Sequence, residues 1–141
     1  MKTILIAGIL STLPLCHAFA EDSKAAIELA ANAPQTLRST KKFIIGRVFE
    51  EGLITESENA FRALLKRKDA LKQLRLLIKD RSPSCQLYAL LGLRLLGADE
   101  FDAEYARMKH SEIAVSTMSG CIAFQATLGD IAEDIKQGKI K

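Results

Sequence analysis

The sequence of 141 residues contains no tryptophan, two tyrosines, two histidines and three cysteines. So few histidines and cysteines leave little material for a metal site, and neither C-x-x-C nor H-E-x-x-H occurs. A G-x-S-x-G nucleophile elbow is also missing. After residue 20 there is no apolar run long enough to cross a bilayer. We therefore expect no cofactor, no metal, no transmembrane segment and no enzymatic activity.

The first 20 residues have the three parts of a secretory signal peptide. Lys2 gives a positive start, residues 4–13 form a short apolar run, and Ala18-Phe19-Ala20 is a small-residue cleavage signal. We expect cleavage near Ala20 and export to the periplasm or the extracellular space. Removing 20 of the 141 residues leaves 121, enough for one domain with a single core, so residues 21–141 are expected to form one helical domain.

Cleavage would remove Cys16 and leave Cys85 and Cys121 as the cysteines of the mature chain. An even number of cysteines in an oxidising compartment predicts one disulfide between them. Closing a loop of about 36 residues would stabilise the fold by about 3.8 kcal/mol on the chain-entropy model. The alternative is a free thiol at Cys85, which could pair with His110 as a thiol–imidazole couple.

Most of the chain has the apolar spacing and the capping residues of short helices. Pro34 is expected to end the first helix, and Thr55, Asp69, Ser82 and Thr127 are expected to cap later ones. The expected helices cover residues 23–33, 36–51, 55–65, 69–78, 82–97, 99–109 and 127–138. The helix over 82–97 is the most apolar, so it should be the central buried helix.

Gly92 lies inside this helix, where glycine costs about 1 kcal/mol, and its expected use is to let a neighbouring helix approach closely. Between residues 113 and 125 the apolar residues alternate instead, which indicates a small β-hairpin or an extended loop. The fold class is therefore mainly all-α. Short helices with short connections suggest an antiparallel array in the manner of HEAT or armadillo pairs, although no unit recurs at a fixed period.

Positive charge is concentrated between residues 62 and 81, with eight basic residues against two acidic ones. Residues 99–112 have the opposite balance, five acidic against two basic. One interpretation is a docking surface in which Arg67, Lys72 and Arg75 bind an acidic protein or an anionic envelope component. The other is a solvated face balanced by internal counter-charge. Nucleic acid is not expected as a partner, because the segment lacks interleaved aromatic residues.

The run QLYALLGLRLL at 86–96, the SGCI at 119–122, and Ile131, Ile135 and Gly138 resemble a pattern in exported bacterial helical proteins catalogued as hypothetical. The resemblance covers about the C-terminal half and implies a secreted helical domain with a cysteine pair, but no activity. Our leading interpretation is a non-catalytic, exported protein-interaction or inhibitor-like module of the bacterial envelope. The alternatives are a structural or assembly component and an enzyme with an unrecognised site.

Overall fold

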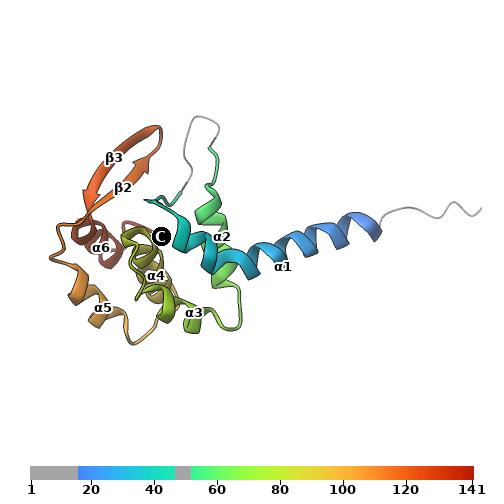
Figure 1. Ribbon diagram of the computed structural model, residues 1–141, viewed down its shortest axis with the longest axis horizontal. Coiled ribbons are helices and arrows are strands. Elements are labelled where there is room, and N and C mark those ends of the chain that lie inside the picture. Colours follow the sequence, from blue (N-terminus) through green and yellow to red (C-terminus); the bar gives the residue numbers. More distant parts are fainter. Residues whose placement is uncertain (1–15, 47–51) are drawn as a thin grey trace, which may run out of the picture.

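The computed structural model describes residues 16–46 and 52–141, which form a mainly helical fold with one small sheet (Figure 1). The predicted signal sequence up to residue 15 and the end of the expected 36–51 helix lie outside the described residues. The elements are α1 (Cys16–Ser39), β1 (Lys42–Phe43), α2 (Glu56–Leu65), α3 (Ala70–Leu77), α4 (Pro83–Leu95), α5 (Phe101–Met108), β2 (Ala114–Ser119), β3 (Ile122–Thr127) and α6 (Leu128–Lys136).

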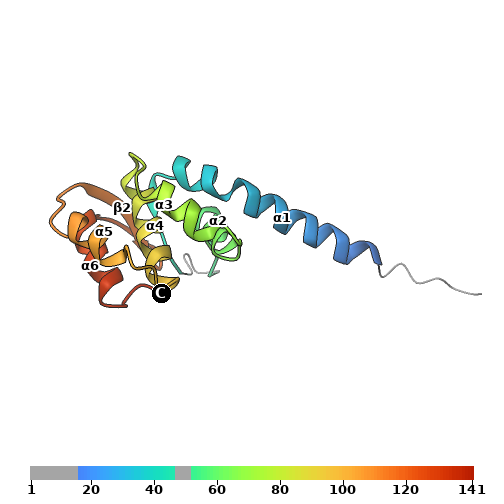
Figure 2. The same cartoon turned by 90° about the horizontal axis from the view of Figure 1, so that it is seen from below.

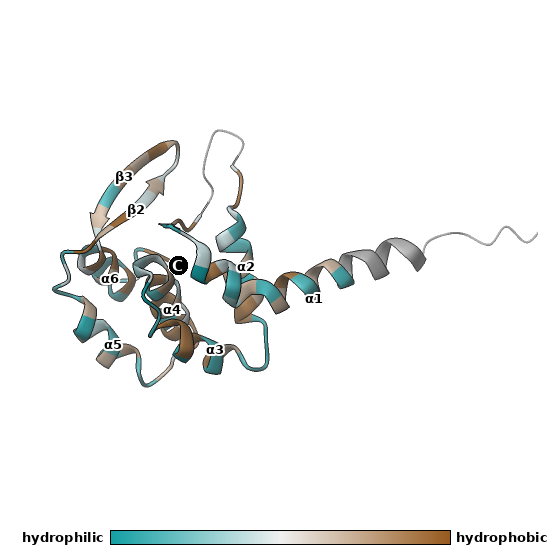
Figure 3. Ribbon diagram, viewed as in Figure 1, coloured by the Kyte–Doolittle hydropathy of each residue, from teal (hydrophilic) through white to brown (hydrophobic). Residues whose placement is uncertain are grey.

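The central helix is α4, as the sequence predicts. Its N-cap Ser82 accepts a hydrogen bond from the Cys85 backbone N–H, Pro83 occupies the first turn, and Gly97 beyond its end has φ +64°. Helices α1, α3, α5 and α6 pack around it, and its ribbon is the most apolar of the molecule (Figures 2 and 3). A Cβ added to Gly92 would lie 2.6 Å from a methyl carbon of Leu74 in α3, so the predicted close approach of a neighbouring helix is confirmed.

The expected helix end at Pro34 is wrong, because α1 continues through this residue to Ser39. Proline has no N–H, so the carbonyl of Ala30, one turn earlier, loses its helical hydrogen-bond donor. The Arg67 Nη1 atom donates a hydrogen bond of 2.8 Å to that carbonyl. A side chain from the α2–α3 connection thus supplies the donor that proline lacks, and the helix persists.

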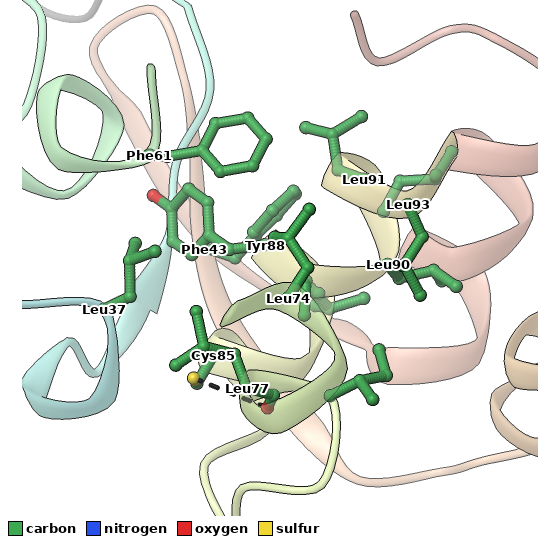
Figure 4. Close-up of a cluster of buried hydrophobic side chains, with 14 of the residues drawn as sticks. Leu37, Phe43, Phe61, Leu74, Leu77, Cys85, Tyr88, Leu90, Leu91 and Leu93 are labelled. Atoms are coloured by element: carbon green, nitrogen blue, oxygen red, sulfur yellow. Dashed lines mark hydrogen bonds between the residues drawn. The ribbon is translucent and has the colours of Figure 1, made fainter. Parts of the chain in front are cut away.

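The expected helix over 36–51 is also wrong, because after Ser39 the described chain becomes extended and forms β1. The Tyr88 hydroxyl of α4 fixes this segment by accepting a hydrogen bond from the Ile44 N–H at 3.1 Å and donating one to the Ile44 carbonyl at 2.8 Å. The ring of Tyr88 lies against Phe43 and Phe61 in the core (Figure 4). Extended backbone here is therefore selected by a distant tyrosine rather than by the local sequence.

The three strands are ordered β1-β2-β3, with β1 parallel to β2 and β2 antiparallel to β3. The β2–β3 pairing runs from Ala114 opposite Thr127 to Ser119 opposite Ile122, and Gly120 in the turn has φ +59°. The hairpin predicted near 113–125 is confirmed. The HEAT or armadillo-like array is not confirmed, since a sheet and one central helix organise the described chain. None of its helices has the length and apolar character needed to cross a membrane.

Candidate functional site

Arg67, the first of the predicted partner-binding residues, is occupied by contacts within the molecule. Its Nε and Nη2 atoms donate to the two carboxylate oxygens of Asp69 at 2.7 and 2.8 Å, and Nη1 holds the Ala30 carbonyl. The hydrogen bonds from Arg67 and Gln73 lower the pKa of the Asp69 carboxyl below its ordinary value. With 27% of its side chain exposed, Arg67 has little left for a partner.

The other two predicted residues lie on the exposed surface of α3. The Arg75 guanidinium pairs with Glu100 at 2.5 Å, in the acidic segment that the sequence interpretation offered as internal counter-charge. Lys72 is exposed and makes no ion pair with any described residue. Arg75 lines a cavity of about 220 Å³ together with Glu100 and Glu104, and neither Arg67 nor Lys72 belongs to that lining. Binding by these residues stays a prediction, but the contacts of both arginines favour the counter-charge interpretation.

The predicted disulfide is not formed, and both Cys85 and Cys121 are free. Cys85 is buried at the start of α4, beside a cavity that reaches the Ala114 end of β2, whereas Cys121 is exposed in the turn at the other end of that strand. Five residues of strand span about 17 Å. A disulfide needs Cα atoms less than about 7 Å apart, so this fold separates the two thiols too far.

The alternative thiol–imidazole pair is not formed either. The Cys85 Sγ atom donates to the Leu77 carbonyl at 3.7 Å (Figure 4). His110 is exposed after the end of α5. Burial is the main cause that raises the pKa of the Cys85 thiol from 9.0 to about 12, which is the opposite of an activated nucleophile. Among the described residues, no group of three or more histidine, cysteine or acidic side chains could hold a metal ion.

The β2–β3 hairpin presents a free backbone edge. Leu128 N–H donates to the Ile113 carbonyl at 2.8 Å, and in an antiparallel pair hydrogen-bonded positions alternate. The backbone groups of Ile122, Phe124 and Ala126 therefore point toward β2. Those of Ala123 and Gln125 point the other way, toward the open side of β3, which is the last strand of the sheet in the described chain.

This edge lacks the features that usually protect an exposed strand. Natural edge strands carry charges, prolines or bulges that prevent pairing with another chain. Residues 114–127 have no charged residue and no proline, and Ile122 and Phe124 are 70% and 47% exposed. Beside Phe124 lies a hollow of about 320 Å³ between the hairpin and the body. Its apolar lining residues include Phe43, Ile45, Met118, Ala126, Ile131 and Ile140, and its charged ones are Asp130, Asp134 and Lys139.

Sequence reasoning located this hairpin but did not identify it as a candidate site, although the uncharged stretch from Ala114 to Thr127 was a usable signal. It also overlooked Ser84, a buried serine in the first turn of α4. Comparisons of this chain with protein-family models, curated proteins and solved structures find no match.

Proposed function

We propose that the protein is a non-catalytic, exported interaction module that binds an extended segment of a partner protein as an additional strand on β3. The observation that supports this most directly is the uncharged, exposed edge with outward-pointing backbone groups at Ala123 and Gln125. Strand addition obtains its affinity from main-chain hydrogen bonds and its specificity from pockets for alternate side chains. The hollow beside Phe124 is suited to receive such side chains.

The partner's character follows from the surface that it would contact. An incoming strand would meet no charge on β3 itself, and its side chains on the Phe124 face would lie beside a hollow that apolar residues line together with Asp130, Asp134 and Lys139. We therefore infer a partner segment with alternating apolar and small polar residues. The acidic partner inferred from residues 62–81 is the weaker candidate, because Arg67 and Arg75 already have carboxylate partners.

Export forms part of the proposal through the leader-like residues 1–20 and the resemblance of the C-terminal half to exported bacterial proteins. A structural or assembly role is the second candidate. It rests on the same edge, since an unprotected strand can pair with a second copy of the chain.

The experiment is a pull-down from the cells that express the protein, with wild type, Gln125→Pro and Gln125→Ala as baits. Proline removes the outward N–H of residue 125 without removing a β2–β3 hydrogen bond, and alanine removes the side chain alone. We expect one partner to be captured by wild type and Gln125→Ala but not by Gln125→Pro. Far-UV circular dichroism of each bait checks that the fold is intact.

The salt concentration distinguishes binding at the β3 edge from binding at the basic segment over residues 62–81. At about 1 M salt the Debye length is near 3 Å, so a contact through residues 62–81 should disappear, whereas strand addition should persist. Capture that is lost in high salt and unaffected by Gln125→Pro would contradict the proposal and favour docking on the basic segment. A concentration-dependent dimer that Gln125→Pro abolishes, with no other protein captured, would assign the edge to self-assembly instead.

A further inference from the structure

A cavity of about 390 Å³ lies at the N-terminus of α4. It is lined by three segments: 38–41 at the end of α1, 82–84 at the start of α4, and 114–116 at the start of β2. The N-terminus of α4, a helix of 13 residues, carries a partial positive charge and backbone N–H groups without helical acceptors. This is the arrangement by which helices bind anions, although a helix terminus alone defines no site.

The side chain of Ser84 also indicates a ligand at this helix end. The residue is only 3% exposed, and its Oγ atom has no hydrogen-bond partner in the described part of the chain. Every wholly inaccessible side-chain oxygen among the described residues has a partner, so the accessible remainder of Ser84 includes Oγ, and the residue lines the cavity. A buried hydroxyl without a partner normally costs stability unless it meets water or a ligand.

The neighbouring hydroxyl and amide groups are already used. Ser82 Oγ accepts from the Cys85 N–H at 3.4 Å and donates to the Thr40 carbonyl at 3.3 Å. Pro83 has no N–H. The donors left for a ligand at this helix end are therefore the hydroxyl and the backbone N–H of Ser84.

Two cationic side chains, Arg38 and Lys41, line the same cavity. Arg38 is in ionic contact with Asp80 through Nε at 3.6 Å, and no hydrogen bond within the described chain occupies its Nη atoms. Lys41 is exposed and has no ion pair among the described residues. Asp80 also accepts the Ser82 N–H at 2.9 Å, and it does not line the cavity. Both cations also neutralise the partial negative charge at the C-terminal end of α1. This role does not account for the unpaired hydroxyl of Ser84.

We propose that this cavity binds the phosphate or sulfate group of a small molecule. The Ser84 hydroxyl and N–H would bind its oxygens from the helix side, and Arg38 and Lys41 would neutralise its charge from the α1 side. A volume of about 390 Å³ exceeds what a single oxyanion fills and is within the usual range for small-molecule sites, so an organic part can be accommodated. This site is separate from the free edge of β3 and does not depend on the proposed function.

The experiment measures the melting temperature of the full chain in inorganic phosphate, inorganic sulfate, acetate and chloride at matched ionic strength. A ligand that binds only the folded state raises the melting temperature by an amount that grows with its concentration relative to its Kd. We expect phosphate or sulfate to raise it more than acetate or chloride, and the larger of the two effects identifies the preferred group. Isothermal titration calorimetry with that anion then gives the Kd.

Ser84→Ala is the decisive variant, because it removes only the hydroxyl. Its melting temperature without ligand should equal or slightly exceed that of wild type, whereas its Kd should rise about tenfold or more, as expected for a lost hydrogen bond to a charged group. Lys41→Gln should weaken binding as well, and Lys72→Gln, with the same charge change on α3, should not. Equal effects of all four anions, or an unchanged Kd in Ser84→Ala, would overturn the proposal.

Discussion

The contact between Arg67 and the Ala30 carbonyl can be tested by a double-mutant cycle with Pro34. Replacing Arg67 with methionine keeps an unbranched stem but removes every donor. The lost charged hydrogen bond to Ala30 should cost about 1.5–3 kcal/mol. The pair with Asp69, whose side chain is 40% exposed, should add no more than about 1 kcal/mol. We therefore expect Arg67→Met to lower the free energy of unfolding by about 1.5–4 kcal/mol.

In a Pro34→Ala background the same substitution should cost less, because the introduced alanine supplies a backbone N–H to the Ala30 carbonyl. The expected coupling is about 1–2 kcal/mol, measured by urea unfolding followed by far-UV circular dichroism. Arg75→Met is the control, since its pair with Glu100 is exposed and remote from Pro34. If Arg67→Met costs the same in both backgrounds to within about 0.5 kcal/mol, the assigned role of Arg67 is refuted.

The remaining predictions concern α4 and the two cysteines Cys85 and Cys121. Tyr88→Phe should cost about 2–4 kcal/mol, because it leaves one buried N–H and one buried carbonyl unpaired, and urea unfolding measures this loss. Gly92→Leu should overpack the α3–α4 contact and destabilise by about 1–3 kcal/mol or more, whereas an unchanged melting temperature would show open space. In a Cys16→Ser variant, Cys121 should react with a thiol reagent in the folded state and Cys85 only after unfolding. The pKa of the Cys85 thiol is raised from 9.0 to about 12 in the folded state, so its contribution to stability should be complete below about pH 9 and disappear as the pH rises toward 12.

Features that depend on a few adjacent residues were predictable from the sequence. The side chains of Thr55, Ser82 and Thr127 each accept the N–H three residues ahead, as expected of N-caps. Asp69 precedes α3 as predicted, but its carboxylate makes no cap hydrogen bond, because Arg67 and Gln73 bind it instead. The capping preference of aspartate therefore does not predict the hydrogen bond when other side chains compete for its carboxylate.

Features decided by distant residues were not predictable. The passage of α1 through Pro34 depends on Arg67, and the extended backbone at Ile44 depends on Tyr88, 44 residues further along the chain. Counting charges located the basic segment correctly, but it could not reveal that Arg75 faces Glu100. The candidate edge at β3 depends on strand order, and strand order is a property of the whole fold.

The outer turns of α1 should be less stable against local unfolding than the turns that pack into the core. Ala33 and Leu37 are the first described side chains of α1 to enter the core, and residues 26–30 border a hollow beside α2, while the turns before them extend away from the body (Figures 1 and 2). A helical segment without tertiary contacts is only marginally stable in water. Amide hydrogen exchange should therefore be fast in the turns before Ala26 and slow beyond Ala33, so the outer end can open and re-form many times while the core stays folded.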